Sequence, residues 1–167
     1  MLIETQRLLI TELKMEMAES LHLNSLDEDH RRFVPDEVFE TVEEAQTVIS
    51  DLMECYQSGE WPQVYAVTLK DGTLVGYVQA VPLQEEWEIG YHIGAAHTRK
   101  GYATEAVKAF LPVVMRQIGV NRILGICLAD NIASVKVLER CGFVKQFEGE
   151  ADYQGEPRQV CRFTYSQ

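Results

Sequence analysis

The 167-residue sequence lacks several features that would assign it to a particular class of protein. No apolar run approaches the roughly 20 residues that cross a membrane as a helix. The first residues, MLIETQRLLI, contain no basic segment and no cleavage site of a secretory signal. The four cysteines lie far apart and form no C-x-x-C pair. These absences predict a cytoplasmic protein with reduced thiols and no membrane partner.

Positive charge is also scarce, because 15 Lys and Arg residues stand against 26 Asp and Glu residues, for a net charge of −11. Phosphate backbones bind clusters of Lys and Arg, so this balance argues against nucleic acid as a partner. Residues 1–96 carry 19 acids and 5 bases, whereas residues 97–167 carry 7 acids and 10 bases. The second part contains either solvated basic helix faces or a local anion site, and counts alone leave both open.

Hydrophobic periodicity and turn residues predict one mixed α/β domain over residues 1–167. We expect helices from residue 15, over 41–56, 101–118 and 131–141, and strands over 2–13, 65–69, 73–81, 86–93, 122–128, 143–149 and 158–166. Asp71-Gly72 predicts a hairpin turn, and Thr41 with Glu44 predicts a capping box. Pro112 predicts a bend or break within its helix. The expected fold is a mostly antiparallel, twisted sheet of about six to seven strands flanked by helices.

The stretch HTRKGYATEAVKAF, residues 97–110, places Arg99 and Lys100 directly before a glycine and a predicted helix. Gly101 can adopt backbone conformations closed to other residues and allows a ligand to approach closely. Every helix opens with unpaired amides, which here belong to Tyr102, Ala103 and Thr104. Together with the helix dipole they favour an anion such as a pyrophosphate. Many ordinary strand-to-helix connections share this pattern, so the stretch alone leaves a phosphate site and a plain turn equally open.

Two segments together, WEIGYHIGAAHTRKGYATEA from Trp87 and ADNIASVKVLERCGF from Ala129, resemble the GNAT superfamily of acetyl-CoA-dependent N-acetyltransferases. The likeness is greatest to the branch that includes the ribosomal-protein N-terminal acetyltransferases. It is dense from Trp87 to Phe143 and weaker over the rest of the chain. The resemblance implies a single GNAT-like domain that uses acetyl-CoA as co-substrate and a small-molecule or peptide amine as acceptor.

The family's phosphate-binding loop reads Q/R-x-x-G-x-G/A, which Gly101 and Ala103 match. Thr98 departs from Gln or Arg, and Arg99 stands where glycine is common in this branch. The resemblance implies cofactor contacts from His92, Ile93, Thr98, Arg99, Lys100, Gly101, Tyr102, Ala103, Thr104, Asn131 and Lys136. For Asn131, helix capping alone explains the residue. For Lys136, a solvated surface position is equally open.

Acetyl transfer from a thioester needs an unprotonated amine and a thiolate that can leave. Glu88 is the candidate base beside the expected thioester, with Glu86 on the same strand face as the alternative. A purely structural role for Glu88 stays open. The tyrosine acid of many family members is replaced at the aligned position by Leu138, so the resemblance implies that Ser134 assists the thiolate. Tyr77, Tyr91 and Tyr102 are other possible proton donors, with packing or stacking as the alternative for each. A thiol with a pKa of about 8.5 also leaves almost unaided.

Three hypotheses remain. The leading one is an N-acetyltransferase whose amine attacks the thioester directly, with the acceptor bound over the acidic N-terminal half, which attracts cations. The second is an acyl-CoA-binding or regulatory module without turnover, and the third is a structural domain with an accidental glycine loop. No metal is expected, because His92 and His97 lack further ligands at convergent spacing. The identity of the acceptor and the choice between monomer and homodimer stay open.

Overall fold

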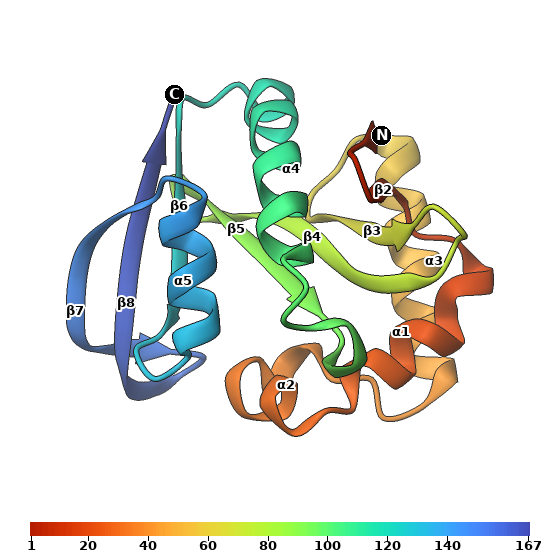
Figure 1. The fold of residues 1–167 in the computed structure, drawn as a ribbon, viewed down its shortest axis with the longest axis horizontal. Coiled ribbons are helices and arrows are strands. Elements are labelled where there is room, and N and C mark those ends of the chain that lie inside the picture. Colours follow the sequence, from red (N-terminus) through yellow and green to blue (C-terminus); the bar gives the residue numbers. More distant parts are fainter.

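The computed structural model describes all 167 residues, and its strands join one sheet (Figure 1). The strands are β1 (Leu2–Glu4), β2 (Leu8–Glu12), β3 (Gln63–Leu69), β4 (Leu74–Leu83), β5 (Glu86–Ile93), β6 (Arg122–Leu128), β7 (Val144–Tyr153) and β8 (Glu156–Ser166). The α-helices are α1 (Ala18–Ser25), α2 (Glu28–Phe33), α3 (Val42–Ser58), α4 (Tyr102–Ile118) and α5 (Ile132–Arg140). Three short 3-10 helices are η1 (Met15–Met17), η2 (Pro35–Glu37) and η3 (Ala95–His97). No helix is both long and apolar enough to span a bilayer.

The strand order is β1-β2-β3-β4-β5-β6-β8-β7, and every neighbouring pair except β5 and β6 is antiparallel. Helices α4 and α5 lie on one face of the sheet, whereas α1 and α3 lie on the other (Figure 1). Phe110 and Phe163 are fully buried in the core under α4 and α5. Leu13 and Ile49 belong to a smaller core on the opposite face. This arrangement confirms the predicted mixed α/β, mostly antiparallel fold.

Local signals in the sequence place several elements correctly. The predicted turn at Asp71-Gly72 joins β3 and β4, with the amide of Thr73 donating to Asp71 Oδ1 at 2.9 Å. Thr41 caps α3 by accepting from the amide of Glu44 at 3.2 Å, as predicted. The carboxylate of Glu44 instead accepts from the amide of Glu40 at 2.6 Å, so the return half of the capping box is shifted by one residue.

The prediction of one strand over residues 2–13 is wrong. Thr5 turns the chain between β1 and β2, because its Oγ1 accepts from the amide of Leu8 at 2.9 Å. The sheet consequently has eight strands rather than six to seven. No helix or strand is predicted between the helix that starts at residue 15 and the one over 41–56, and this stretch contains α2 and η2. Asp27 caps α2 through Oδ1, which accepts from the amide of His30 at 2.7 Å.

The expected interruption at Pro112 does not break the helix, since α4 is continuous from Tyr102 to Ile118. Pro112 lies on the exposed side, while Leu111 and Val114 are buried against the sheet. Packing of the apolar face therefore compensates for the backbone donor that proline lacks.

Candidate active site

Strands β5 and β6 meet at a single point, where Glu88 pairs with Leu124. From this point toward the loop before α4 the two strands diverge and leave an opening between them (Figure 1). Helix α2 lies at the wide end of this opening. The other edge of β5 stays paired with β4, and the amide of Gly94 donates to Val75 O at 2.9 Å. Because successive amides of a strand point to opposite edges, the amide of Ile93 points into the opening. The edge of β5 beyond Glu88 can therefore pair with an extended ligand.

The alternation of amide directions along β5 also corrects the cofactor contact expected from His92. Its amide points toward β4, at the position where it pairs with Tyr77, and away from the opening. Its ring lies on the face of the sheet opposite α4, among residues of α1 and α2. The backbone contact expected from His92 therefore passes to Ile93.

The loop before α4 concentrates unpaired backbone donors. The amides from residue 99 to residue 104 have no acceptor in the chain, and the next amide, on Glu105, donates to Gly101 O at 3.1 Å. Arg99 and Gly101 have φ angles of 62° and 79°, on either side of Lys100. Alternating left-handed and right-handed residues turn successive N–H groups toward one point and create an anion-binding concavity. The positive φ of Arg99 is one that glycine adopts without steric cost, which fits the glycine that the resemblance implies at this position.

The side chains of this loop leave that concavity accessible. Thr98, Arg99 and Lys100 are exposed, and the two cations make no ion pair within the chain. The hydroxyl of Thr98 donates to Ala95 O at 2.9 Å and thereby closes the preceding turn. Ala103 is half-buried in the first turn of α4, as are Tyr102 and Thr104. Positive charge and unpaired donors thus occur at the same place.

Arg7 and Glu105 support the loop on its inner side, and no local pattern in the sequence singles out either residue. Arg7 donates from Nε to Glu105 Oε2 at 2.7 Å and from Nη1 to the carbonyl of Lys100 at 2.8 Å. Its guanidinium lies 4.7 Å from the centre of the Tyr102 ring. The hydroxyl of Thr5 donates to Glu105 Oε1 at 2.7 Å. The loop is therefore ordered before a ligand binds, which reduces the entropy that binding must overcome.

Glu88 points to the face of the sheet opposite α4 and makes no hydrogen bond or ion pair within the chain. Burial, followed by the charges of Glu37 and Asp36, raises the pKa of Glu88 to about 7. The alternative, Glu86, accepts from Arg122 and also from Arg162 Nη2, the latter at 2.6 Å. Of the two carboxylates, only Glu88 has oxygens that remain available to a substrate.

A second carboxylate, Glu37 of η2, is fixed over the same face. It accepts from the hydroxyl of Tyr77 and, at 2.7 Å, from Gln79 Nε2. Gly90 permits this contact, because a Cβ at that position would lie 2.6 Å from Gln79 Nε2. Residues 88 and 90 share one strand face, so Glu37 is held close to the side of β5 that carries Glu88.

Ser134 lies across the opening from β5, at the start of α5. Its Oγ is 2.7 Å from the hydroxyl of Tyr91, which also donates to Ser134 O at 3.2 Å. Burial raises the pKa of Tyr91, so its hydroxyl stays protonated at neutral pH. Asn131 caps α5, accepting from the amide of Ser134 at 3.2 Å. The predicted capping is confirmed. Tyr91 and Ser134 are separate candidate donors in the sequence, and the structure brings their hydroxyls into contact.

The remaining residues of α5 divide between core and surface. Leu138 is 1% exposed and packs over Gly125, where an added Cβ would lie 2.5 Å from Leu138 Cδ2. It belongs to the core and carries no proton-donating group. Lys136 and Arg140 are exposed and make no ion pair in the chain. The structure leaves both cations accessible on the helix surface.

The segment α2–η2 reaches across to the C-terminal half of the chain. Arg32 Nη2 lies 2.5 Å from Asp130 Oδ2, and the hydroxyl of Tyr153 donates to Phe33 O at 2.7 Å. These contacts enclose the Glu88 side of the opening. A cavity of about 570 Å³ lies beside them, lined by Arg32, Leu128, Ala129, Asp130, Arg158 and Gln159. Another, of about 620 Å³, lies at the opposite end of β5, around Trp87 and Met115, away from the Gly101 loop.

Comparisons with known proteins agree with this geometry. The acetyltransferase (GNAT) domain family matches residues 7–144. The uncharacterized N-acetyltransferase YnaD of Bacillus subtilis is 27% identical over 147 residues, which cover 86% of this chain and 83% of YnaD. The probable N-acetyltransferase YjcK of the same organism is 31% identical over 111 residues, covering 64% of this chain and 61% of YjcK.

Solved structures share the fold along the whole chain. A GNAT-family acetyltransferase from Bacillus anthracis superposes with a TM-score of 0.84 at 24% identity, covering 99% of this chain and 98% of that one. RimL, a ribosomal-protein α-N-acetyltransferase solved with coenzyme A, superposes with a TM-score of 0.83 at 18% identity, covering 99% and 98% of the two chains. From the match to its domain family, the chain belongs to the GNAT acetyltransferases.

Proposed function

We propose that this acetyltransferase moves an acetyl group from acetyl-CoA to a primary amine by direct attack, with both substrates bound together. The observation that carries the proposal is the row of unpaired amides from residue 99 to residue 104, next to the open edge of β5. Acetyl-CoA supplies an activated acetyl thioester and a pyrophosphate. An anion suits these amides, and an extended chain suits the strand edge.

The residues that would hold acetyl-CoA follow from this placement. Gly101, Tyr102, Ala103 and Thr104 offer amides to the pyrophosphate, as do Arg99 and Lys100, which add positive charge. The Ile93 amide is positioned to donate at the strand edge, where it can also stabilise negative charge on an acyl oxygen. Asn131, Lys136 and Thr98 remain secondary candidates, since Asn131 already caps α5 and Thr98 already closes a turn.

Glu88 is the proposed base. A carboxylate with a pKa of about 7 is half ionised near neutral pH, where it can accept a proton from an ammonium or from an attacking amine, directly or through water. Its ionised fraction rises with pH, so the rate should rise through pH 7 and then level off. The acidic side chains of Asp36 and Glu37 on the same face favour a cationic acceptor.

The proposed acid is the Tyr91–Ser134 pair rather than Ser134 alone. The two hydroxyls are 2.7 Å apart, so a proton given up by Ser134 can be replaced from Tyr91. Leu138 is excluded from this role by its chemistry and its burial. We further propose that the protein acts in the cytoplasm, which the four free thiols support.

A thiol-release assay with acetyl-CoA and a panel of amines tests the proposal. The panel should include polyamines, free amino acids and peptides with a free N-terminus. Amine-dependent release that falls in Glu88→Gln but persists in the matched control Glu86→Gln supports the assigned base. Acetyl-CoA binding without thiol release on any amine would instead support the regulatory module. The observation that favours this second candidate is Leu138, which stands in place of the usual tyrosine.

A further inference from the structure

Two arginines line the cavity of about 570 Å³ at the C-terminal end of β6. Arg32 comes from α2 and Arg158 from β8, and residues 128–130 lie between them where β6 ends. This end of β6 points toward α2, as Figure 1 shows. No step of the proposed reaction uses either arginine, so their presence beside the acceptor side of the opening needs a separate account.

The alternation of side chains along β8 places Arg158 on the face of the sheet that carries Glu88. Arg158 and Arg162 are four residues apart on one strand, so their side chains share a face. Arg162 Nη2 donates to Glu86 Oε2 at 2.6 Å, and Glu86 shares the face of Glu88. Arg158 therefore lies on the acceptor side of the sheet, opposite α4 and α5.

The length of β6 gives the distance between Glu88 and the cavity. Leu124 pairs with Glu88, and Leu128, four residues further along β6, lines the cavity. At about 3.3 Å per residue, the two leucines are separated by about 13 Å. Both leucines and Ile126 lie on the face of Glu88 by the same alternation, so the surface between the base and the cavity is apolar.

Contacts between distant parts of the chain hold the walls of this path. Gln154 Nε2 donates to Asp36 Oδ1 at 2.8 Å, next to the bond from the Tyr153 hydroxyl to Phe33 O. Burial, followed by the charge of Glu88, raises the pKa of Tyr153, which fits a ring close to that carboxylate. The turn between β7 and β8 and the segment α2–η2 are thus fixed together beside Glu88.

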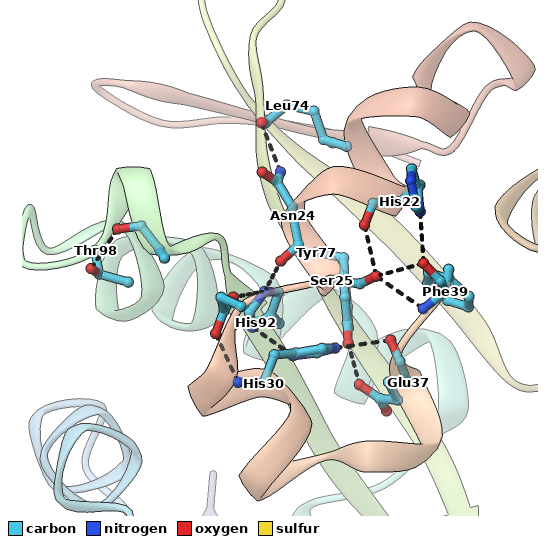
Figure 2. A network of polar contacts seen from close by, with 12 residues as sticks. His22, Asn24, Ser25, His30, Glu37, Phe39, Leu74, Tyr77, His92 and Thr98 are labelled. Carbon is cyan, nitrogen blue, oxygen red and sulfur yellow. Dashed lines mark hydrogen bonds and ion pairs between the residues drawn. The ribbon is translucent and has the colours of Figure 1, made fainter. Parts of the chain in front are cut away.

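The two ends of the path carry opposite charge. At the Glu88 end, Glu37 is held by the hydroxyl of Tyr77, as Figure 2 shows. At the cavity, Asp130 accepts one N–H of Arg32 at 2.5 Å and leaves the other four N–H groups of that guanidinium available. Arg158 makes no ion pair within the chain. A guanidinium binds a carboxylate or phosphate through paired, charge-assisted hydrogen bonds.

We propose that the cavity between Arg32 and Arg158 binds an anionic group of the acceptor, so that the enzyme selects amines carrying a carboxylate or phosphate about 13 Å from the reacting nitrogen. Asp130 positions Arg32 for this contact. In an extended peptide, about four residues span that distance. A free amino acid is too short to reach both ends. The proposal rests on the acetyl-transfer function proposed above, because Glu88 defines the amine end.

A series of hexapeptides with a free N-terminus and an amidated C-terminus tests the selection. Each peptide carries one Glu at a position from 2 to 6, and its matched control carries Gln there. Thiol release should give a kcat/KM roughly tenfold higher for Glu than for Gln at position 4 or 5. Phosphoserine at the same position tests a phosphate, and a preference for either anion that needs Arg158 supports the site.

Substitutions connect the preference to the cavity. Arg158→Gln and Arg32→Gln should reduce the ratio of kcat/KM between the Glu and Gln peptides to about one. Arg158→Glu should reverse it in favour of a Lys peptide. The control Arg116→Gln removes an exposed arginine at the opposite end of β5 and should keep the preference. A loss of acetyl-CoA affinity in Arg158→Gln would place this arginine at the cofactor and overturn the proposal.

Isothermal titration of the protein saturated with coenzyme A, which carries no acetyl group, measures peptide binding without chemistry. The Glu peptide should bind roughly tenfold tighter than its Gln control in wild type and equally in Arg158→Gln. Equal affinities in wild type at every position, including no binding of either peptide, would overturn the anion site even if amines are acetylated. Preferential binding without thiol release from any amine would support the site and contradict the proposed transfer.

Discussion

Replacing Glu88 by Gln should stabilise the folded protein at neutral and alkaline pH while slowing acetyl transfer. The pKa of Glu88 is raised from 4.5 to about 7, with burial as the first cause. A carboxyl group of this kind binds its proton more tightly in the folded than in the unfolded state. The stability penalty from ionising it is therefore absent below about pH 4.5, grows between pH 4.5 and 7, and stays constant above pH 7.

The size of the effect follows from the shift in pKa. A rise of about 2.5 units at about 1.36 kcal/mol per unit gives an upper bound of about 3 kcal/mol. For a chain of this length, 1 kcal/mol changes the melting temperature by roughly 2–4 °C. Glu88→Gln should therefore raise the melting temperature by up to roughly 6–12 °C at pH 8 and leave it nearly unchanged at pH 4.

Calorimetric or fluorescence melts of wild type and variant across pH 4 to 8 measure this difference. Glu86→Gln is the matched control, because it removes a carboxylate two residues away that is paired with Arg122 and Arg162. It should lower stability slightly or not at all, and it should not produce a gain that grows with pH. An equal effect of Glu88→Gln at pH 4 and pH 8, or no gain at pH 8, would refute the assignment of a raised pKa.

Three further substitutions test the cofactor loop and the leaving-group pair. Ala103→Glu places a carboxylate among the unpaired amides and should abolish acetyl-CoA binding without unfolding the protein. The control is Lys108→Glu, at an exposed position of the same helix, and this variant should bind acetyl-CoA normally in the same titration. Arg7→Ala removes the support of the loop and should weaken acetyl-CoA affinity roughly tenfold, or about 1.4 kcal/mol; unchanged affinity would show that the loop orders without it. Tyr91→Phe should lower kcat more than it changes acetyl-CoA affinity, and an unchanged kcat would remove Tyr91 from proton donation.

Much of the fold was predictable because its signals are local. Asp71-Gly72 forms its turn through residues within two positions of each other, and Thr41 caps its helix through an amide three residues away. The loop at Gly101 was identified for the same reason, since a glycine and the unpaired amides of a helix start are visible in a short window. These elements need only backbone preference and neighbouring side chains.

The missed features depend on partners far apart in the chain. Arg7 and Glu105 are separated by 98 positions, and His30 and His92 by 62. The split of the N-terminal strand depends partly on the first of these pairs, because Thr5 and Arg7 both turn toward Glu105. Nothing in the sequence singles out Arg7 or His30, since an isolated Arg or His has many possible partners. Only the sheet order brings these residues together.

Isothermal titration of the purified protein with acetyl-CoA tests the central claim most directly. We expect binding in the micromolar range and a raised melting temperature, since a ligand at 100 times its Kd adds about 2.7 kcal/mol of stability. Ala103→Glu measured alongside should bind nothing while melting near the wild-type temperature. No binding by a folded wild-type protein would contradict the account, because the unpaired amides from residue 99 to residue 104 would then not form a coenzyme A site.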